Sequence, residues 1–155
     1  MLKIMDTDRA IDSIRLLTLK YRVLNATESW LQSFSFGGGV SIIFENIENR
    51  LERFPLQELD AAAMYHLLLC IKHIMKTDGL DVVFGTKGLI EGIVHCLHFE
   101  YDMLVMEVLE ILCVCLHYGS TASRASFHIL QGFIYLSEER KEVPFEIFVK
   151  ALNDV

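Results

Sequence analysis

Histidine and cysteine side chains occur in this chain at a spacing that would suit metal binding. His66, Cys70 and His73 follow one another at i, i+4 and i+7, which places them on one face of a helix. The sequence contains no Cys-x-x-Cys pair, no His-Glu-x-x-His segment and no second cluster at zinc-finger spacing. We therefore interpret these side chains as helix surface and core, and we expect no metal ion.

Nucleophilic chemistry would require an activated thiol. The four cysteines, Cys70, Cys96, Cys113 and Cys115, all lie within apolar helical patterns. In such surroundings a cysteine acts as a small buried hydrophobic residue, and burial raises the pKa of the thiol. A reactive cysteine needs an exposed thiolate with a base in reach. The pattern therefore favours inert thiols in a reducing, cytosolic environment.

Two carboxylates and a glycine-rich segment are the remaining chemical candidates. Glu107 and Glu110 are the only charged residues in the apolar segment 103–118. No second acidic motif accompanies them for acid–base catalysis, so we expect them on a solvated or groove-lining face. Gly37, Gly38 and Gly39 precede a helix, but the Gly-Lys-Ser/Thr of a phosphate-binding loop is absent. We predict a protein without enzymatic activity and without a cofactor.

These residues are positioned by helices, because apolar residues recur with helical spacing along nearly the whole chain. Thr27 is a predicted N-cap for a helix over 28–34, and the triple glycine ends it. Further helices are predicted over 40–54, 56–76, 80–84, 88–99, 101–118, 123–136 and 144–152. The first helix is expected to begin at Asp6 or Thr7 and to present one apolar face made of Ile11, Ile14, Leu17 and Tyr21.

Composition excludes several classes of protein. Hydrophobic residues make up 52% of the 155 residues, which excludes a disordered chain. The net charge of -7 argues against a nucleic-acid partner or an anionic membrane surface. Segment 103–118 is shorter than the ~20 predominantly apolar residues of a membrane span, and it holds two carboxylates. We therefore interpret it as a core helix.

The chain also resembles itself. The segment FGGGVSIIFENIENRL begins at Phe36, and FGTKGLIEGIVHCLHF begins at Phe84, about 48 residues later. In each, Phe-Gly leads through a further glycine into an apolar helix. Stacked units of this kind share one core. The predicted fold is an all-α, armadillo/HEAT-like right-handed helical solenoid of about three repeats, with 103–118 as the core helix of a central repeat. We divide it into an N-terminal helix, 1–26, and a repeat domain, 27–155.

Four segments carry a resemblance to a known family. They are ESWLQSFSFGGGVSIIFENI, LLLCIKHIMKTDGLDVVFGTKGLIEGIVHCL, VLEILCVCLHYG and VPFEIFVKALNDV. In this order they resemble the armadillo repeats of diaphanous-related formins, in the formin homology 3 or diaphanous inhibitory region. The resemblance covers about residues 27–155.

The resemblance implies a protein-binding module without catalysis. A Rho-family GTPase in its GTP form would bind the amino-terminal part and first repeats. A groove would hold an amphipathic autoregulatory helix from a formin C-terminus, linking the module to actin only indirectly and placing it in the cytoplasm at the cytoskeleton. The GTPase-facing loop would contain Met75, Lys76, Thr77 and Asp78, and the groove would contain Glu107, Glu110, Ile111, Val114 and His117.

One departure keeps an alternative open. The family's GTPase-facing loop usually has two adjacent asparagines, whereas this sequence has Lys76, Thr77 and Asp78 there. The alternative is a generic armadillo or HEAT scaffold that binds another peptide or protein and is unrelated to Rho GTPases.

Overall fold

The chain folds into helices that form two compact units. The computed structural model describes residues 2–53, 55–117 and 122–153. One unit comprises residues 1–86 and the other residues 87–155, and we call them unit 1 and unit 2. No strand occurs among the described residues, so the predicted all-α class is confirmed. The right-handed sense, the number of repeats and the domain boundary after residue 26 stay predictions.

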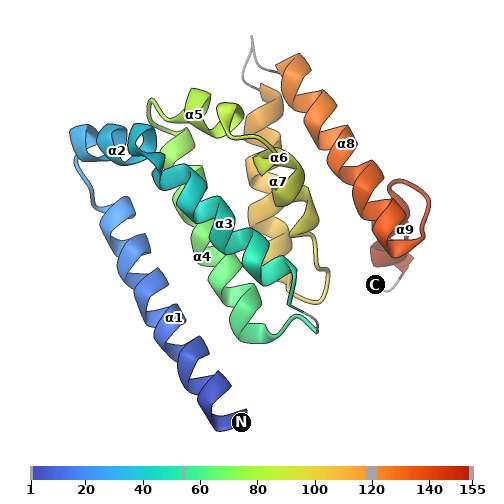
Figure 1. The fold of residues 1–155 in the computed structure, drawn as a ribbon. Helices are drawn as coiled ribbons and strands as arrows, with labels where there is room; N and C mark the ends of the chain where they lie inside the picture. The colour runs from blue at the N-terminus through green and yellow to red at the C-terminus, as the bar shows by residue number, and fades with distance from the viewer. Residues whose placement is uncertain (1, 54, 118–121, 154–155) are drawn as a thin grey trace. The chain divides into compact units, whose positions relative to one another are not determined.

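Unit 1 is built on the long helix α4 (Figure 1). Both α1 and α3 pack against α4, and α5 contacts it as well. The bounds of the elements are α1 Leu2–Leu24, α2 Glu28–Phe34, the kinked turn η1 Ser35–Gly39, α3 Val40–Leu51, α4 Glu58–Met75 and α5 Leu80–Gly85.

Capping residues set several of these bounds. The prediction that Thr27 begins α2 is confirmed, because its Oγ1 accepts a hydrogen bond from the backbone N–H of Trp30 at 3.4 Å. The predicted start of α4 at residue 56 is two residues early. The buried Asp60 accepts from the backbone N–H of Gln57 at 3.4 Å and from Arg53 Nη1 at 2.8 Å, which fixes the helix start at Glu58.

The first helix differs from its prediction in two ways. Its backbone is helical from Leu2, so neither Asp6 nor Thr7 is its N-cap. Its packing against α4 buries Leu16 and Val23, whereas the expected apolar face of Ile14, Leu17 and Tyr21 is exposed, Tyr21 to 71%. The side chain of Ile11 lies outside the described residues. Two apolar stripes run along α1. Packing against α4 buries the stripe that contains Leu16 and Val23 rather than the predicted one.

Unit 2 contains two closely packed helix pairs, α6 with α8 and α7 with α8. Gly132 on α8 allows the first pair to approach, because a Cβ atom there would lie 3.0 Å from Val94 Cβ and 3.2 Å from Glu91 Cα. His128 Nδ1 also lies 2.6 Å from Glu91 Oε1 between the same helices. The helices of unit 2 are α6 Leu89–His95, α7 Asp102–His117, α8 Ala122–Arg140 and α9 Glu146–Asn153.

Aromatic rings hold the end of unit 2 together. The Phe133 ring centroid lies 4.8 Å from that of Phe145 and 5.5 Å from that of Phe148. Phe99, before α7, meets Phe148 edge-on at 5.7 Å. The short helix α9 is thus attached through these rings, and none of its described residues is fully buried.

The predicted internal repeat has a counterpart in the order of elements. A short helix, a glycine turn, a middle helix and a long helix follow one another twice, as α2–α3–α4 and as α5–α6–α7. Gly38 before α3 and Gly88 before α6 both have positive φ angles, 94° and 79°. Glycine is the residue that adopts this backbone without steric cost. A glycine with positive φ therefore precedes the middle helix in both halves of the repeat, although Gly38 and Gly88 are 50 residues apart rather than 48.

Candidate functional site

The loop predicted to face a GTPase is the tight turn between α4 and α5. Met75 is buried in the last turn of α4, whereas Lys76 and Asp78 are exposed and Thr77 is half-buried. The turn thus presents two charged side chains of opposite sign, and Met75 anchors it from below.

Hydrogen bonds at the end of α4 give this turn a defined shape. The Thr77 hydroxyl donates to the Ile74 carbonyl at 2.7 Å, and the Thr77 N–H donates to the same oxygen at 3.1 Å. The Lys76 N–H donates to the carbonyl oxygens of Lys72 and His73. Gly79 comes next in the turn. A Cβ atom at this residue would lie 2.9 Å from the Ile74 carbonyl oxygen, so any residue other than glycine would require the backbone to shift.

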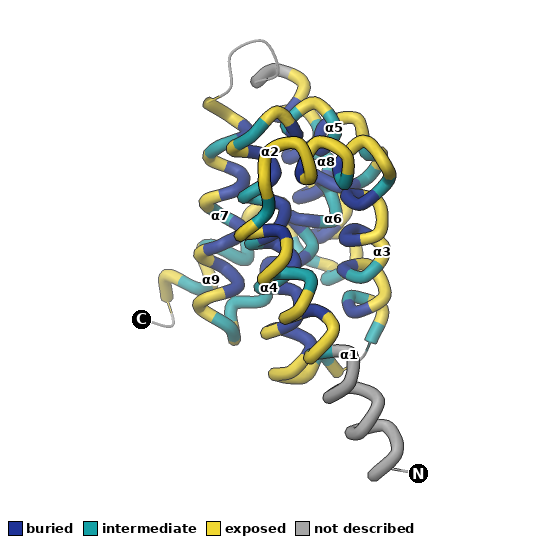
Figure 2. The backbone as a smooth tube through the Cα atoms, turned by 90° about the vertical axis from the view of Figure 1, so that its left-hand side faces the viewer, coloured by how far each residue is buried: buried dark blue, intermediate teal, exposed yellow. Residues whose placement is uncertain are grey.

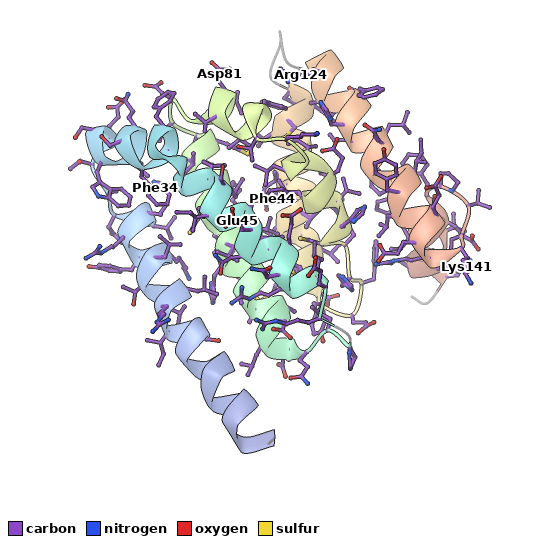
Figure 3. All side chains as sticks on the ribbon, in the orientation of Figure 1. Phe34, Phe44, Glu45, Asp81, Arg124 and Lys141 are labelled. Carbon is purple, nitrogen blue, oxygen red and sulfur yellow. The ribbon has the colours of Figure 1, made fainter. Side chains whose placement is uncertain are left out.

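The helix α2 lies beside this turn at the same end of unit 1 (Figure 1). Gln32 Nε2 on α2 donates a hydrogen bond to Asp78 Oδ2 at 2.8 Å. On the same helix Trp30 stacks on Phe34 at 5.0 Å with an interplanar angle of 9°, and Trp30 is partly exposed. Asp81, in the first turn of α5, projects outward (Figure 3). The helix α2 and the α4–α5 turn therefore form a surface on which the aromatic side chain of Trp30 lies near the polar pair of Gln32 and Asp78.

The groove predicted on α7 is divided between a buried and an exposed face. Glu107 and Ile111 are buried, Glu107 to 4% exposure, whereas Glu110 and His117 are exposed and Val114 is half-buried. The expectation that Glu107 lies on a solvated face is therefore wrong. Glu107 lies between Leu104 and Ile111 in the helical spacing, on the face that packs into unit 2.

The exposed face of α7 also carries apolar side chains that sequence analysis did not single out. Buried and exposed residues alternate along this helix (Figure 2), so α7 is not covered all round as expected for a core helix. Met103 is 64% exposed and Met106 58% exposed. We call this side the α7 outer face; it consists of Met103, Met106, Glu110, Cys113 and His117. Tyr118, the last residue of the predicted helix, lies outside the described residues.

Comparison with protein families identifies the family to which this chain belongs. A family profile described as the diaphanous GTPase-binding domain matches residues 7–117. The chain belongs to the diaphanous GTPase-binding domain family. The resemblance to diaphanous-related formins stated from sequence is confirmed, and so is the class of GTPase-binding modules. A search of curated proteins found no match.

The matched region of this diaphanous-type domain includes both candidate surfaces. The α4–α5 turn and the α7 outer face both fall within residues 7–117, whereas α8 and α9 follow it. The family is one of binding domains rather than of enzymes. Across the described residues, no helix is long and apolar enough to cross a membrane.

The thiols of this formin-type domain are placed as expected with one exception. Cys70, Cys96 and Cys115 are buried, and burial raises the pKa of each thiol, to about 11, about 12 and about 11. Cys113 is exposed on α7, so its predicted burial is wrong. In the part of the chain that the structure describes, no group of three His, Cys, Asp or Glu residues is arranged to hold a metal ion.

Two features of the candidate surfaces of this diaphanous-type domain were not predicted from the sequence: the exposed methionines of α7 and the contact of Gln32 with Asp78. Met103 and Met106 could have been found, because with Glu110 they follow the i, i+3, i+7 spacing on the side opposite the buried residues. Gln32 carried no such signal. It meets Asp78 from 46 residues away, and only the packing of α2 beside the turn brings the two together.

Proposed function

We propose that this chain is a non-catalytic regulatory module that binds a Rho-family GTPase in its GTP form and, on a second surface, an amphipathic helix from a formin C-terminus. Through these two partners it would control the organisation of the actin cytoskeleton in the cytoplasm, acting on actin only indirectly. The observation that carries the proposal is the match of residues 7–117 to the diaphanous GTPase-binding domain.

The α4–α5 turn is the proposed GTPase contact. Its backbone is held by hydrogen bonds from Thr77 to Ile74 and from Lys76 to Lys72 and His73, so the turn presents its side chains on a defined backbone. A preorganised surface binds with a smaller entropic cost. Met75 is buried and would support the turn rather than contact the partner.

The α7 outer face is the proposed site for the autoregulatory helix. Helix-in-groove recognition requires an apolar strip on the receptor with charged residues beside it. Met103 and Met106 supply flexible apolar contact area, and the exposed Glu110 lies on the same face. Val114 is half-buried at the edge of this face and His117 lies at its end, while Glu107 and Ile111 would support it from the buried side.

A capture experiment tests the GTPase contact. The purified chain is immobilised and exposed to Rho-family GTPases loaded with a GTP analogue or with GDP. We expect GTP-selective capture that falls about tenfold when Lys76, Thr77 and Asp78 are replaced together by alanine. Arg124→Ala, an exposed cation on α8, is the control and should leave capture unchanged (Figure 3). Equal capture by the triple variant would contradict the assignment of the turn, and absence of nucleotide dependence would favour the generic scaffold.

A further inference from the structure

The hydrogen bond between Gln32 and Asp78 has no evident role in ending α4. The last carbonyls of that helix already accept hydrogen bonds from Lys76 and Thr77. Asp78 follows Thr77 in sequence. Its carboxylate accepts a hydrogen bond from the Gln32 side chain of α2 at 2.8 Å. A side chain that reaches across from another helix to hold an exposed carboxylate orients that carboxylate.

The chemistry of the donor matters for the charge at this position. Gln32 is neutral, so its amide fixes the direction of the Asp78 carboxylate without cancelling the negative charge. Among the residues that the structure describes, no lysine, arginine or histidine forms an ion pair with Asp78. The full charge therefore remains available at an exposed position.

Gln32 is itself held in place. Thr27 caps the start of α2, and Leu31, next to Gln32 in sequence, is buried at 3% exposure. The Trp30–Phe34 stack stiffens the same short helix. The amide of Gln32 is thus presented by an anchored helix, and its orienting effect on Asp78 does not depend on the turn alone.

We propose that Gln32 is a positioning residue of the GTPase-binding surface, and that the Asp78 carboxylate it orients pairs with a lysine or arginine side chain of the bound GTPase. This inference rests on the proposed function, because it assigns the partner's chemistry at the same turn. Charged groups at the edge of an interface act mainly on association rate and salt dependence, and only moderately on affinity.

Binding measurements on four proteins test the inference. They are the wild-type chain, Asp78→Asn, Gln32→Leu and the double variant, each titrated with a Rho-family GTPase loaded with a GTP analogue at about 50 and about 300 mM salt. We expect Asp78→Asn to weaken binding about three- to tenfold at low salt and to flatten the salt dependence. Gln32→Leu should weaken binding about two- to fivefold. The double variant should bind like Asp78→Asn alone, because Gln32 acts through the charge.

Matched controls separate orientation from folding. Gln131→Leu is the same substitution at another exposed hydrogen bond, from Gln131 Nε2 to the Tyr135 hydroxyl at 2.8 Å within α8, and should leave binding unchanged. The thermal unfolding temperature of each variant shows whether it is folded.

The outcomes distinguish the inference from the function on which it rests. Wild-type affinity and wild-type salt dependence in Asp78→Asn would overturn the inference, and so would effects of the two single variants that multiply in the double variant. In both cases GTP-selective binding by the wild-type chain would leave the proposed function standing. Absence of GTP-selective binding by the wild-type chain would contradict both.

Discussion

Lys20 Nζ on α1 lies 3.2 Å from His66 Nδ1 on α4, and this contact joins the first helix to the central helix of unit 1. The lysine donates and the imidazole nitrogen accepts, so His66 must be neutral to make the bond. Burial, and then the nearby Lys20 charge, lower the pKa of His66 from its ordinary value of 6.5. Protonation of His66 would therefore remove one polar contact between α1 and α4, in addition to which apolar packing of Leu16 and Val23 holds α1.

We expect stability to fall as the pH decreases through 6.5. In the unfolded chain His66 takes up a proton near pH 6.5, whereas the folded protein resists protonation until a lower pH. The unfolded state then binds more protons, and the free energy of unfolding decreases with falling pH. His66→Gln does not titrate and should flatten this dependence, measured by denaturant unfolding between about pH 7.5 and about pH 5.

A second histidine serves as the comparison. His98 in unit 2 also has a lowered pKa, mainly through burial. His98→Gln should remove its own part of the pH dependence, so the double variant should be flatter than either single variant. An unchanged slope in His66→Gln would contradict the lowered pKa of His66 in the folded protein.

One thiol should react in the native protein. Cys113 is exposed, while Cys70, Cys96 and Cys115 are buried and have thiol pKa values raised to about 11, 12 and 11. A chromogenic thiol reagent at about pH 8 should label one cysteine in the folded chain and all four in denaturant. Cys113→Ser should abolish the native reaction. Rapid labelling of that variant would show that a buried thiol is accessible.

Gly79 should be required for the shape of the α4–α5 turn. In Gly79→Ala the new Cβ atom would clash with Ile74, including its backbone oxygen at 2.9 Å. We expect a loss of about 1–3 kcal/mol in the free energy of unfolding, measured with urea, because the clashing backbone atom cannot move aside freely. Gly37→Ala is the matched control, since its Cβ would meet nothing within 4 Å. Equal stability of the two variants would contradict this account of the turn.

The α7 outer face should bind an amphipathic basic helix. Met106 is 58% exposed, so Met106→Asp should cost little stability but should introduce a charge into the proposed apolar strip. We expect at least about a tenfold loss of affinity for a labelled peptide of a formin C-terminal autoregulatory segment, measured by fluorescence anisotropy. Leu152→Asp, the same change of type at an exposed position on α9, should have no effect. Equal losses from both variants would contradict a defined site on α7.

Local sequence was sufficient for most helices because their ends are set by nearby residues. Thr27 caps α2 through a contact three residues away, and Thr77 bonds the Ile74 carbonyl at the end of α4. The buried face of α1 was not predictable in this way. Ile14 and Leu16 belong to two different apolar stripes, and only contact with α4 decides which stripe is buried.

The candidate site was likewise only partly predictable from local sequence. Asp78 could be singled out from its position after α4, but its orientation depends on Gln32, 46 residues earlier. Glu107 was misplaced because a charged residue on an apolar helix is ordinarily solvated, whereas here packing in unit 2 buries it. Contacts between distant segments therefore account for most of what the sequence did not predict.

The most direct test of the central claim is a calorimetric titration of the purified chain with one Rho-family GTPase at a time, loaded either with a GTP analogue or with GDP. The account predicts that at least one GTPase binds in the GTP-analogue form at least about tenfold more tightly than in the GDP form, which corresponds to about 1.4 kcal/mol. Equal affinity for the two nucleotide forms across the family, from a folded helical protein, would contradict it.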